Sequence, residues 1–123
     1  HPEEPDLGYL YGTIFTDGNI GNEGKSSANI CVFADEQIDR SPTGSGVTAR
    51  MAIAAARKVI APGELCQFES VTGAVFTGEL KNTAKVGPFN AVTVEVAGHA
   101  YYSGSAEFTF EVGDPLGGGF LLK

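Results

Sequence analysis

The hydrophobic positions change their rhythm along the chain, from one nearly continuous apolar stretch to an alternation with period two. Between Gly46 and Ile60 the apolar character is broken only by four side chains, Thr48, Arg50, Arg57 and Lys58. Pro42 lies just before this stretch and Ala61-Pro62-Gly63 follows it, which is typical of a helix start and stop. The pattern predicts a helix over 44–60 that is buried on most sides, because it has little polar surface.

Two strands are predicted before this helix. The segment from Leu7 to Asp17 is rich in the β-favouring residues Tyr, Ile, Phe and Thr. Asn29–Ala34 is a continuous apolar run bounded by polar residues, which is typical of a strand buried on both faces. Residues 1–6 carry two prolines among acids, so we expect a connector there and a chain that is a fragment of a longer one.

Four more strands are predicted after the helix, at 65–71, at 74–80, around Val92, Val94 and Val96, and at 106–112. In the last segment Ala106, Phe108, Phe110 and Val112 share one face, opposite Glu107, Thr109 and Glu111. The tail 113–120 is predicted to be a loop. The expected order is β-β-α-β-β-β-β, a single α+β domain over 1–123 with mixed or antiparallel β-structure around one central apolar helix.

Composition narrows the classes of function. The 123 residues include 15 acids and 8 bases, a net charge of −7, which argues against a nucleic-acid or anionic-membrane partner. No apolar run approaches the roughly 20 residues that cross a bilayer. The two cysteines, Cys31 and Cys66, lie in apolar segments without neighbouring ligand residues. We therefore expect reduced core thiols in a cytoplasmic protein, and no metal site.

Candidate chemistry gathers at the start of the predicted helix, in the segment 39–52. Gly44 and Gly46 leave backbone N–H groups unshielded where the helix begins, and a helix N-terminus attracts anions. A lone Gly-x-Gly is weak evidence, and the lysine of a phosphate-binding P-loop is absent. Asp39 could pair with an ammonium group or be an ordinary N-cap or turn aspartate. Thr43 could equally be a helix cap.

The segment 39–50, Asp-Arg-Ser-Pro-Thr-Gly-Ser-Gly-Val-Thr-Ala-Arg, resembles the second active-site signature of the proline racemase family. Further matches cover essentially the whole chain, at 10–14, 29–34, 72–78 and 114–120. The resemblance implies the C-terminal half of a two-domain enzyme with the diaminopimelate-epimerase-like fold. In that fold each half wraps β-structure around a helix, and the substrate lies between the two helix N-termini.

The resemblance also implies roles for individual residues. Asp39 would contact the ring amine of a proline-like substrate, and the N–H groups of Gly44 and Ser45 would hold its carboxylate. Thr43 stands where racemases carry a cysteine, and would line the pocket without acting as a strong acid or base. Threonine there implies loss of water from trans-3-hydroxy-L-proline to give pyrroline-2-carboxylate, with no cofactor.

The implied partners are this small-molecule substrate and the N-terminal half-domain, which carries the catalytic base and is absent from the chain. This fragment alone is expected to be inactive. Two alternatives stay open: a proline racemase or hydroxyproline epimerase relative, and a non-catalytic stand-alone fragment. An uncovered partner face would also permit a homodimer.

Overall fold

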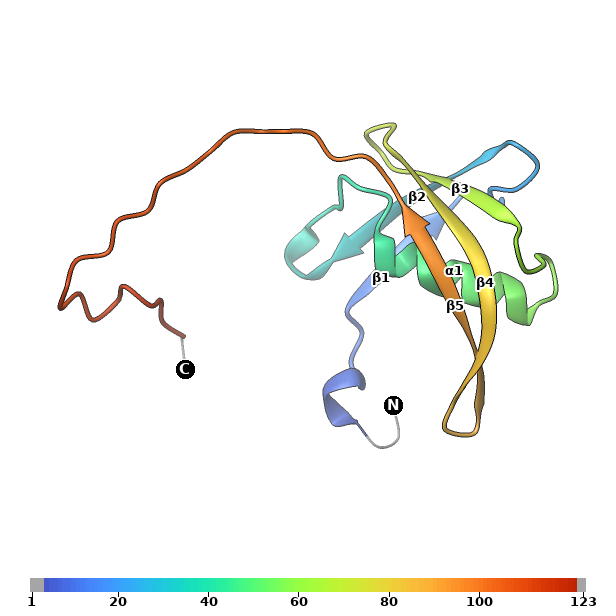
Figure 1. Ribbon diagram of the computed structural model, residues 1–123, viewed down its shortest axis with the longest axis horizontal. Coiled ribbons are helices and arrows are strands. Elements are labelled where there is room, and N and C mark those ends of the chain that lie inside the picture. Colours follow the sequence, from blue (N-terminus) through green and yellow to red (C-terminus); the bar gives the residue numbers. More distant parts are fainter. Residues whose placement is uncertain (1–3, 122–123) are drawn as a thin grey trace.

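One sheet and one helix form the body of the protein in the computed structural model, which describes residues 4–121 (Figure 1). The sheet holds five strands in chain order: β1 (Gly12–Thr16), β2 (Ser26–Phe33), β3 (Leu65–Glu69), β4 (Val75–Val86) and β5 (Phe89–Ala97). The helix α1 (Gly44–Ala56) connects β2 to β3, the parallel pair, whereas the other neighbours are antiparallel. A parallel pair needs such a crossover, and the α+β class is confirmed.

The core lies between α1 and the strands. Val47, Met51 and Ala54 of the helix are buried together with residues of the strands and the loop after the helix, Ile60, Cys66, Phe68 and Leu80. A Cβ on Gly78 would stand 3.0 Å from Val47 and 3.1 Å from Met51, so the missing side chain lets the helix approach β4 closely. Both cysteines are buried and free, as predicted.

Helix α1 begins at Gly44 as predicted but ends at Ala56, before the predicted Ile60. Lys58 adopts φ +59°, while Lys58 N–H donates to Ala55 and Val59 N–H donates to Ala54. These two hydrogen bonds form a Schellman motif, which stops the helix. The helix is also more open than predicted, because Ile53 on its outer side is 50% exposed. No helix among the described residues is long and apolar enough to cross a membrane.

The strand β2 differs from the predicted strand buried on both faces. Its buried residues alternate as Ser27, Asn29 and Cys31, whereas Ile30 between them is 40% exposed. The helix and the loop before it lie over one face only, so the apolar run is half exposed.

The N-terminal segment contains less strand than predicted. Of the predicted strand 7–17, only Gly12–Thr16 pairs with β2, and a single 3-10 turn, η1 (Pro5–Leu7), precedes it. Residues 1–3 of the predicted connector lie outside the described residues.

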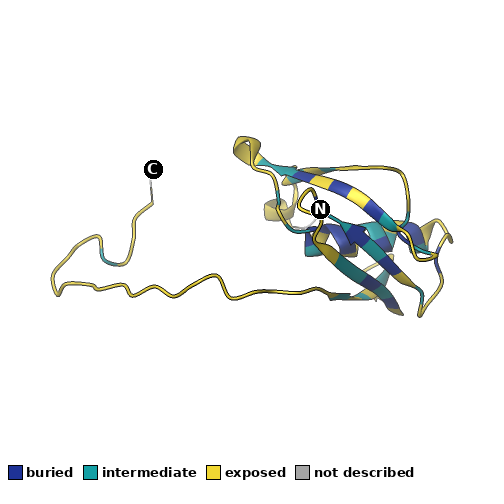
Figure 2. Cartoon of the chain, turned by 90° about the horizontal axis from the view of Figure 1, so that it is seen from above, coloured by how far each residue is buried: buried dark blue, intermediate teal, exposed yellow. Residues whose placement is uncertain are grey.

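The predicted strand at 106–112 is wrong. Residues 98–112 form neither helix nor strand, and the chain leaves the end of β5 as an extended segment away from the body (Figure 1). Nearly all of this segment is exposed (Figure 2). A strand is stabilised by a neighbouring strand, and none of the described residues supplies one here.

Candidate functional site

The loop between β2 and α1 turns back alongside β2 and so brings Asp39 next to the helix start. Phe33 N–H donates to Gln37 C=O at 2.8 Å, and Asp39 N–H donates to Cys31 C=O at 3.0 Å. Val32 and Ile38 form an isolated antiparallel bridge between these two bonds. The backbone of Asp39 is therefore fixed by the sheet.

The carboxylate of Asp39 accepts hydrogen bonds on both oxygens. Ser41 N–H donates to Oδ1 at 2.8 Å, and the Thr43 hydroxyl donates to Oδ2 at 2.9 Å. Partial burial disfavours the charged form, but these hydrogen bonds and neighbouring Arg40 outweigh burial and lower the pKa of Asp39. Asp39 is thus a turn aspartate that stays ionised, with lone pairs left for a further donor.

Thr43 occupies the N-cap position of α1 in a strained conformation. Its φ of 66° and ψ of 93° are rare for a β-branched residue, which pays steric strain at positive φ. Its carbonyl accepts the first helical bond, from Val47 N–H, at 2.8 Å, but its side chain caps no N–H group. Thr43 therefore stands at the helix-cap position, as one of the two predictions had it, but its side chain does not cap the helix, because its hydroxyl donates to Asp39.

The first turn of α1 presents backbone donors beside this pair. Gly44 and Ser45 are its first two residues, followed by the buried Gly46. No described residue accepts a hydrogen bond from the N–H groups of these three positions. With the positive end of the helix dipole they form a place for an anion. The structure thus brings all four predicted residues, Asp39, Thr43, Gly44 and Ser45, to one helix end.

Three polar side chains that the sequence analysis missed hold this loop from outside. The hydroxyls of Ser70 and Thr72 donate to the Arg40 carbonyl at 2.7 and 2.8 Å. The side-chain amide of Asn29 donates to the Pro42 carbonyl at 3.4 Å, while its Oδ1 is buried without a partner. Asn29 is the one polar residue of the otherwise apolar run 29–34, and this exception to the pattern could have indicated that its side chain has a polar partner. Both carbonyls flanking Ser41 are therefore held, which limits how Thr43 can relax.

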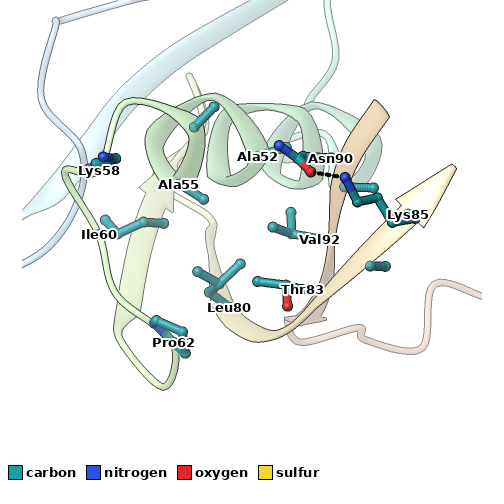
Figure 3. A pocket seen from close by; sticks show the side chains of 13 residues that line it. Ala52, Ala55, Lys58, Ile60, Pro62, Leu80, Thr83, Lys85, Asn90 and Val92 are labelled. Atoms are coloured by element: carbon teal, nitrogen blue, oxygen red, sulfur yellow. Dashed lines mark hydrogen bonds between the residues drawn. The ribbon is translucent and has the colours of Figure 1, made fainter. Parts of the chain in front are cut away.

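A groove of about 610 Å³ lies elsewhere, between the C-terminal half of α1 and the β4–β5 hairpin. Figure 3 shows its walls, which consist mainly of small and aliphatic side chains such as Ala52, Ala55 and Val92. Lys85 at its rim is hydrogen-bonded to Asn90. None of the four predicted site residues lines this groove, and its chemistry is that of an uncovered apolar surface.

No group of three or more His, Cys, Asp or Glu side chains within residues 4–121 could hold a metal ion. The chemistry of the helix end is that of a carboxylate, a hydroxyl and N–H donors. This set can bind a zwitterion, because the ionised Asp39 attracts a cation and the N–H groups attract an anion. Asp39 is a weak base because its pKa is lowered, so this set contains no strong general base.

Comparison with known proteins gives one consistent family. Residues 1–121 match the family described as proline racemase. The chain is 56% identical to the trans-L-3-hydroxyproline dehydratase of Mus musculus and 53% identical to the trans-3-hydroxy-L-proline dehydratase of Homo sapiens, in each case over its whole length. It spans only 35% of the length of these relatives.

A solved structure shows the same fold. The hydroxyproline epimerase of Agrobacterium vitis, crystallised with bound trans-4-hydroxy-L-proline, superposes with a TM-score of 0.78 at 29% identity. The match covers 99% of this chain and 34% of the epimerase. The family match, the relatives and the shared fold agree, and the chain belongs to the proline racemase family.

Proposed function

We propose that this chain is the substrate-binding half of a trans-3-hydroxy-L-proline dehydratase, a cofactor-independent hydro-lyase. The observation that carries the proposal is Thr43, whose hydroxyl is bonded to Asp39 at the start of α1 in a chain that is 53–56% identical to two named dehydratases. The catalytic base belongs to the N-terminal half-domain of the complete enzyme. In this proposal residues 1–123 form a single domain, the C-terminal half of that enzyme.

The substrate is a zwitterion, and the helix end offers a partner for each of its charges. The substrate carboxylate accepts from the N–H groups of Gly44 and Ser45, where the dipole favours negative charge. The ring ammonium donates to Asp39, whose lowered pKa keeps it ionised at neutral pH. The N–H groups belong to the first turn of α1 and the backbone of Asp39 is held by β2, so the two contacts fix Cα relative to Thr43.

The reaction removes the elements of water. A base in the N-terminal half takes the Cα proton, the electron pair of that bond forms the Cα–C3 double bond, and the C3–O bond breaks. The hydroxide departs as water with the proton that the base took from Cα, and the enamine tautomerises to pyrroline-2-carboxylate. Because the N–H groups hold the carboxylate, they also stabilise the negative charge that develops beside Cα.

Thr43 accounts for elimination in place of racemisation. Racemisation requires an acid that returns a proton to the opposite face of Cα, and a threonine hydroxyl is too weak an acid for that task. Its proton is moreover donated to Asp39, at 2.9 Å. The hydroxyl oxygen can still accept a hydrogen bond, so Thr43 lines the pocket and contacts the substrate without transferring a proton.

A second candidate function is epimerisation, favoured by the likeness to the hydroxyproline epimerase structure. Incubating the complete enzyme with trans-3-hydroxy-L-proline in deuterated water separates the two. The dehydratase predicts a cyclic imine product and no recovered substrate with inverted Cα. Recovery of the opposite Cα epimer carrying deuterium, without loss of water, would establish epimerisation and overturn the proposal.

A further inference from the structure

Phe76 lies near the start of β4, on the face of the sheet that packs against α1. Side chains two residues apart on a strand share one face, so Phe76, Gly78 and Leu80 face the helix together. Leu80 is buried in the core, and a Cβ on Gly78 would meet Val47 and Met51. Phe76 is therefore the residue of β4 that continues this contact beyond the core.

The ring of Phe76 lies beside the first residue of α1. Its Cε2 is the nearest atom to a Cβ built on Gly44, at 4.0 Å. The Cα–Cβ bond of a helical residue tilts toward the helix N-terminus, so this position lies beside the space into which the first N–H groups point. The ring therefore borders the place for an anion at Gly44 and Ser45.

Gly98 leaves room for the ring on its other side. It directly follows the last residue of β5, and its backbone is not in the left-handed region, so the chain conformation does not require a glycine there. A Cβ on Gly98 would collide with Cδ1 and Cε1 of Phe76 and would stand 3.4 Å from its Cγ. Cδ1 and Cε1 lie on the edge of the ring opposite Cε2. The ring thus fills the space between the end of β5 and the start of α1, and a side chain at position 98 would displace it.

We propose that Phe76 is a further substrate-binding residue, whose ring, held in place by the lack of a side chain at Gly98, shields the substrate carboxylate from water at the start of α1. This inference rests on the proposed function, which supplies the carboxylate. An apolar wall lowers the local dielectric constant, and there the N–H groups of Gly44 and Ser45 bind a charged group more strongly than in water.

Binding of L-proline tests this inference without turnover to a dehydrated product, because L-proline has the carboxylate but no hydroxyl to lose. Its dissociation constant is measured by titration calorimetry with the complete enzyme. Phe76→Val removes every ring atom beyond Cγ and should weaken binding by about tenfold, the effect of exposing a charge-assisted hydrogen bond to water.

Phe68→Val is the matched control. Phe68 lies opposite Phe76 on β3 and is 1% exposed, within the core. Its replacement should lower the stability of the enzyme in urea unfolding but leave the dissociation constant of L-proline unchanged. Equal weakening of L-proline binding by the two variants, or no weakening by Phe76→Val, would overturn the proposal.

Gly98→Ala tests how the ring is held. In the parent enzyme it should displace the ring of Phe76 and weaken L-proline binding. In the Phe76→Val background it should cause no further loss, because the atoms with which the new methyl group collides are gone. The same loss in both backgrounds, or no loss in the parent, would contradict the role given to Gly98 and the ring.

The outcomes distinguish this inference from the proposed function. If L-proline binding depends on Phe76 as expected but the complete enzyme does not dehydrate trans-3-hydroxy-L-proline, only the proposed function is contradicted. If the enzyme dehydrates this substrate but binds L-proline equally well without the ring, or does not bind L-proline at all, only the inference about Phe76 is contradicted.

Discussion

At the scale of single residues, Thr43 combines a strained backbone with a hydroxyl that is already committed. A non-glycine residue in such a sparsely populated conformation costs about 1–3 kcal/mol, which the surrounding bonds must offset. Ser41 Oγ accepts from Thr43 N–H at 3.1 Å, and Asp39 holds the side chain. In this backbone conformation the side chain of Thr43 does not cap the helix and instead donates to Asp39. The proposed substrate would contact the helix at this point.

Replacing Thr43 by cysteine in the complete enzyme should create racemisation. The thiol is a far stronger acid than the hydroxyl and can return a proton to Cα on its own face. With L-proline, which has no hydroxyl to lose, the Thr43→Cys enzyme should slowly form D-proline, measurable by chiral chromatography. Thr43→Ser is the matched control and should form none. Equal formation of D-proline by both variants, or by neither, would contradict the role given to Thr43.

The sequence predicted which residues meet at this end but not how they are bonded. Asp39, Thr43, Gly44 and Ser45 could be placed together because the helix start was evident from its proline and glycines. Whether Thr43 capped the helix depended on its backbone angles, which no periodicity reveals. Asn29, Ser70 and Thr72 come from other elements, so their contacts with the loop required the tertiary fold.

At the scale of elements, Gly46 is where α1 and β1 meet. A Cβ at this position would collide with the terminal methyl of Ile14 and would stand 3.2 Å from Thr43 Cγ2. Glycine inside a helix costs about 1 kcal/mol relative to alanine, so its presence here reflects the lack of space. The missing side chain lets Thr43 fit between the helix and the strand.

We expect Gly46→Ala to destabilise the chain by about 1 kcal/mol in urea unfolding, because overpacking of about 1–3 kcal/mol exceeds the gain in helix propensity. Ile14→Val removes the colliding methyl and should restore part of the loss in the double variant. Gly44→Ala is the control, since its Cβ would lie 4.0 Å from the nearest atom, of Phe76. Equal destabilisation at Gly44 and Gly46 would contradict this account of the packing.

The predicted elements were correct where pattern and neighbours agreed. The period-two segment around Val94 and the start of α1 were predicted because their local signals coincide with their packing. The second half of β4, Lys81–Val86, is mostly polar and escaped notice, although Lys81 pairs with Glu79 at 2.8 Å and Glu95 at 3.5 Å. The segment 106–112 shows the reverse case, a strand pattern without a neighbour among the described residues.

At the scale of the whole molecule, Asp17 ties the loop between β1 and β2 to α1. Its carboxylate accepts from both the side chain and the backbone of Asn19, from Ala28 N–H and from the Ser27 hydroxyl. Ser27 in turn accepts from Arg50 of α1 at 2.6 Å. The hydrogen bonds from the side chain and backbone of Asn19 are the main cause that lowers the pKa of Asp17 from 3.8 to about 2.

This lowered pKa predicts a pH-dependent stability. The unfolded chain binds a proton at Asp17 more readily than the folded chain, so the contribution is complete above about pH 4 and fades as the pH falls toward 2. In urea unfolding, Asp17→Asn should be less stable than the parent at neutral pH, with a gap that narrows over this range. Glu107→Gln, in the exposed C-terminal segment 98–121, lies outside this hydrogen-bond network and should keep the stability of the parent at neutral pH. A gap for Asp17→Asn that stays constant with pH would contradict the assignment.

The organisation of the complete enzyme also limited what the sequence could predict. The helix end carries a carboxylate and backbone N–H donors, and in the proposed half-site the N-terminal half-domain supplies the surface that faces them. The groove of Figure 3 and the exposed course of the C-terminal segment 98–121 depend on contacts between elements, so the local sequence pattern does not predict them.

Turnover of trans-3-hydroxy-L-proline by the complete enzyme and by the 123-residue chain, side by side, tests the central claim most directly. The account predicts that the complete enzyme releases water and pyrroline-2-carboxylate, whereas the chain alone gives no product above the uncatalysed rate. Dehydration by the chain alone at an enzyme-like rate would contradict the half-site account. A complete enzyme that leaves trans-3-hydroxy-L-proline undehydrated would contradict the proposed reaction.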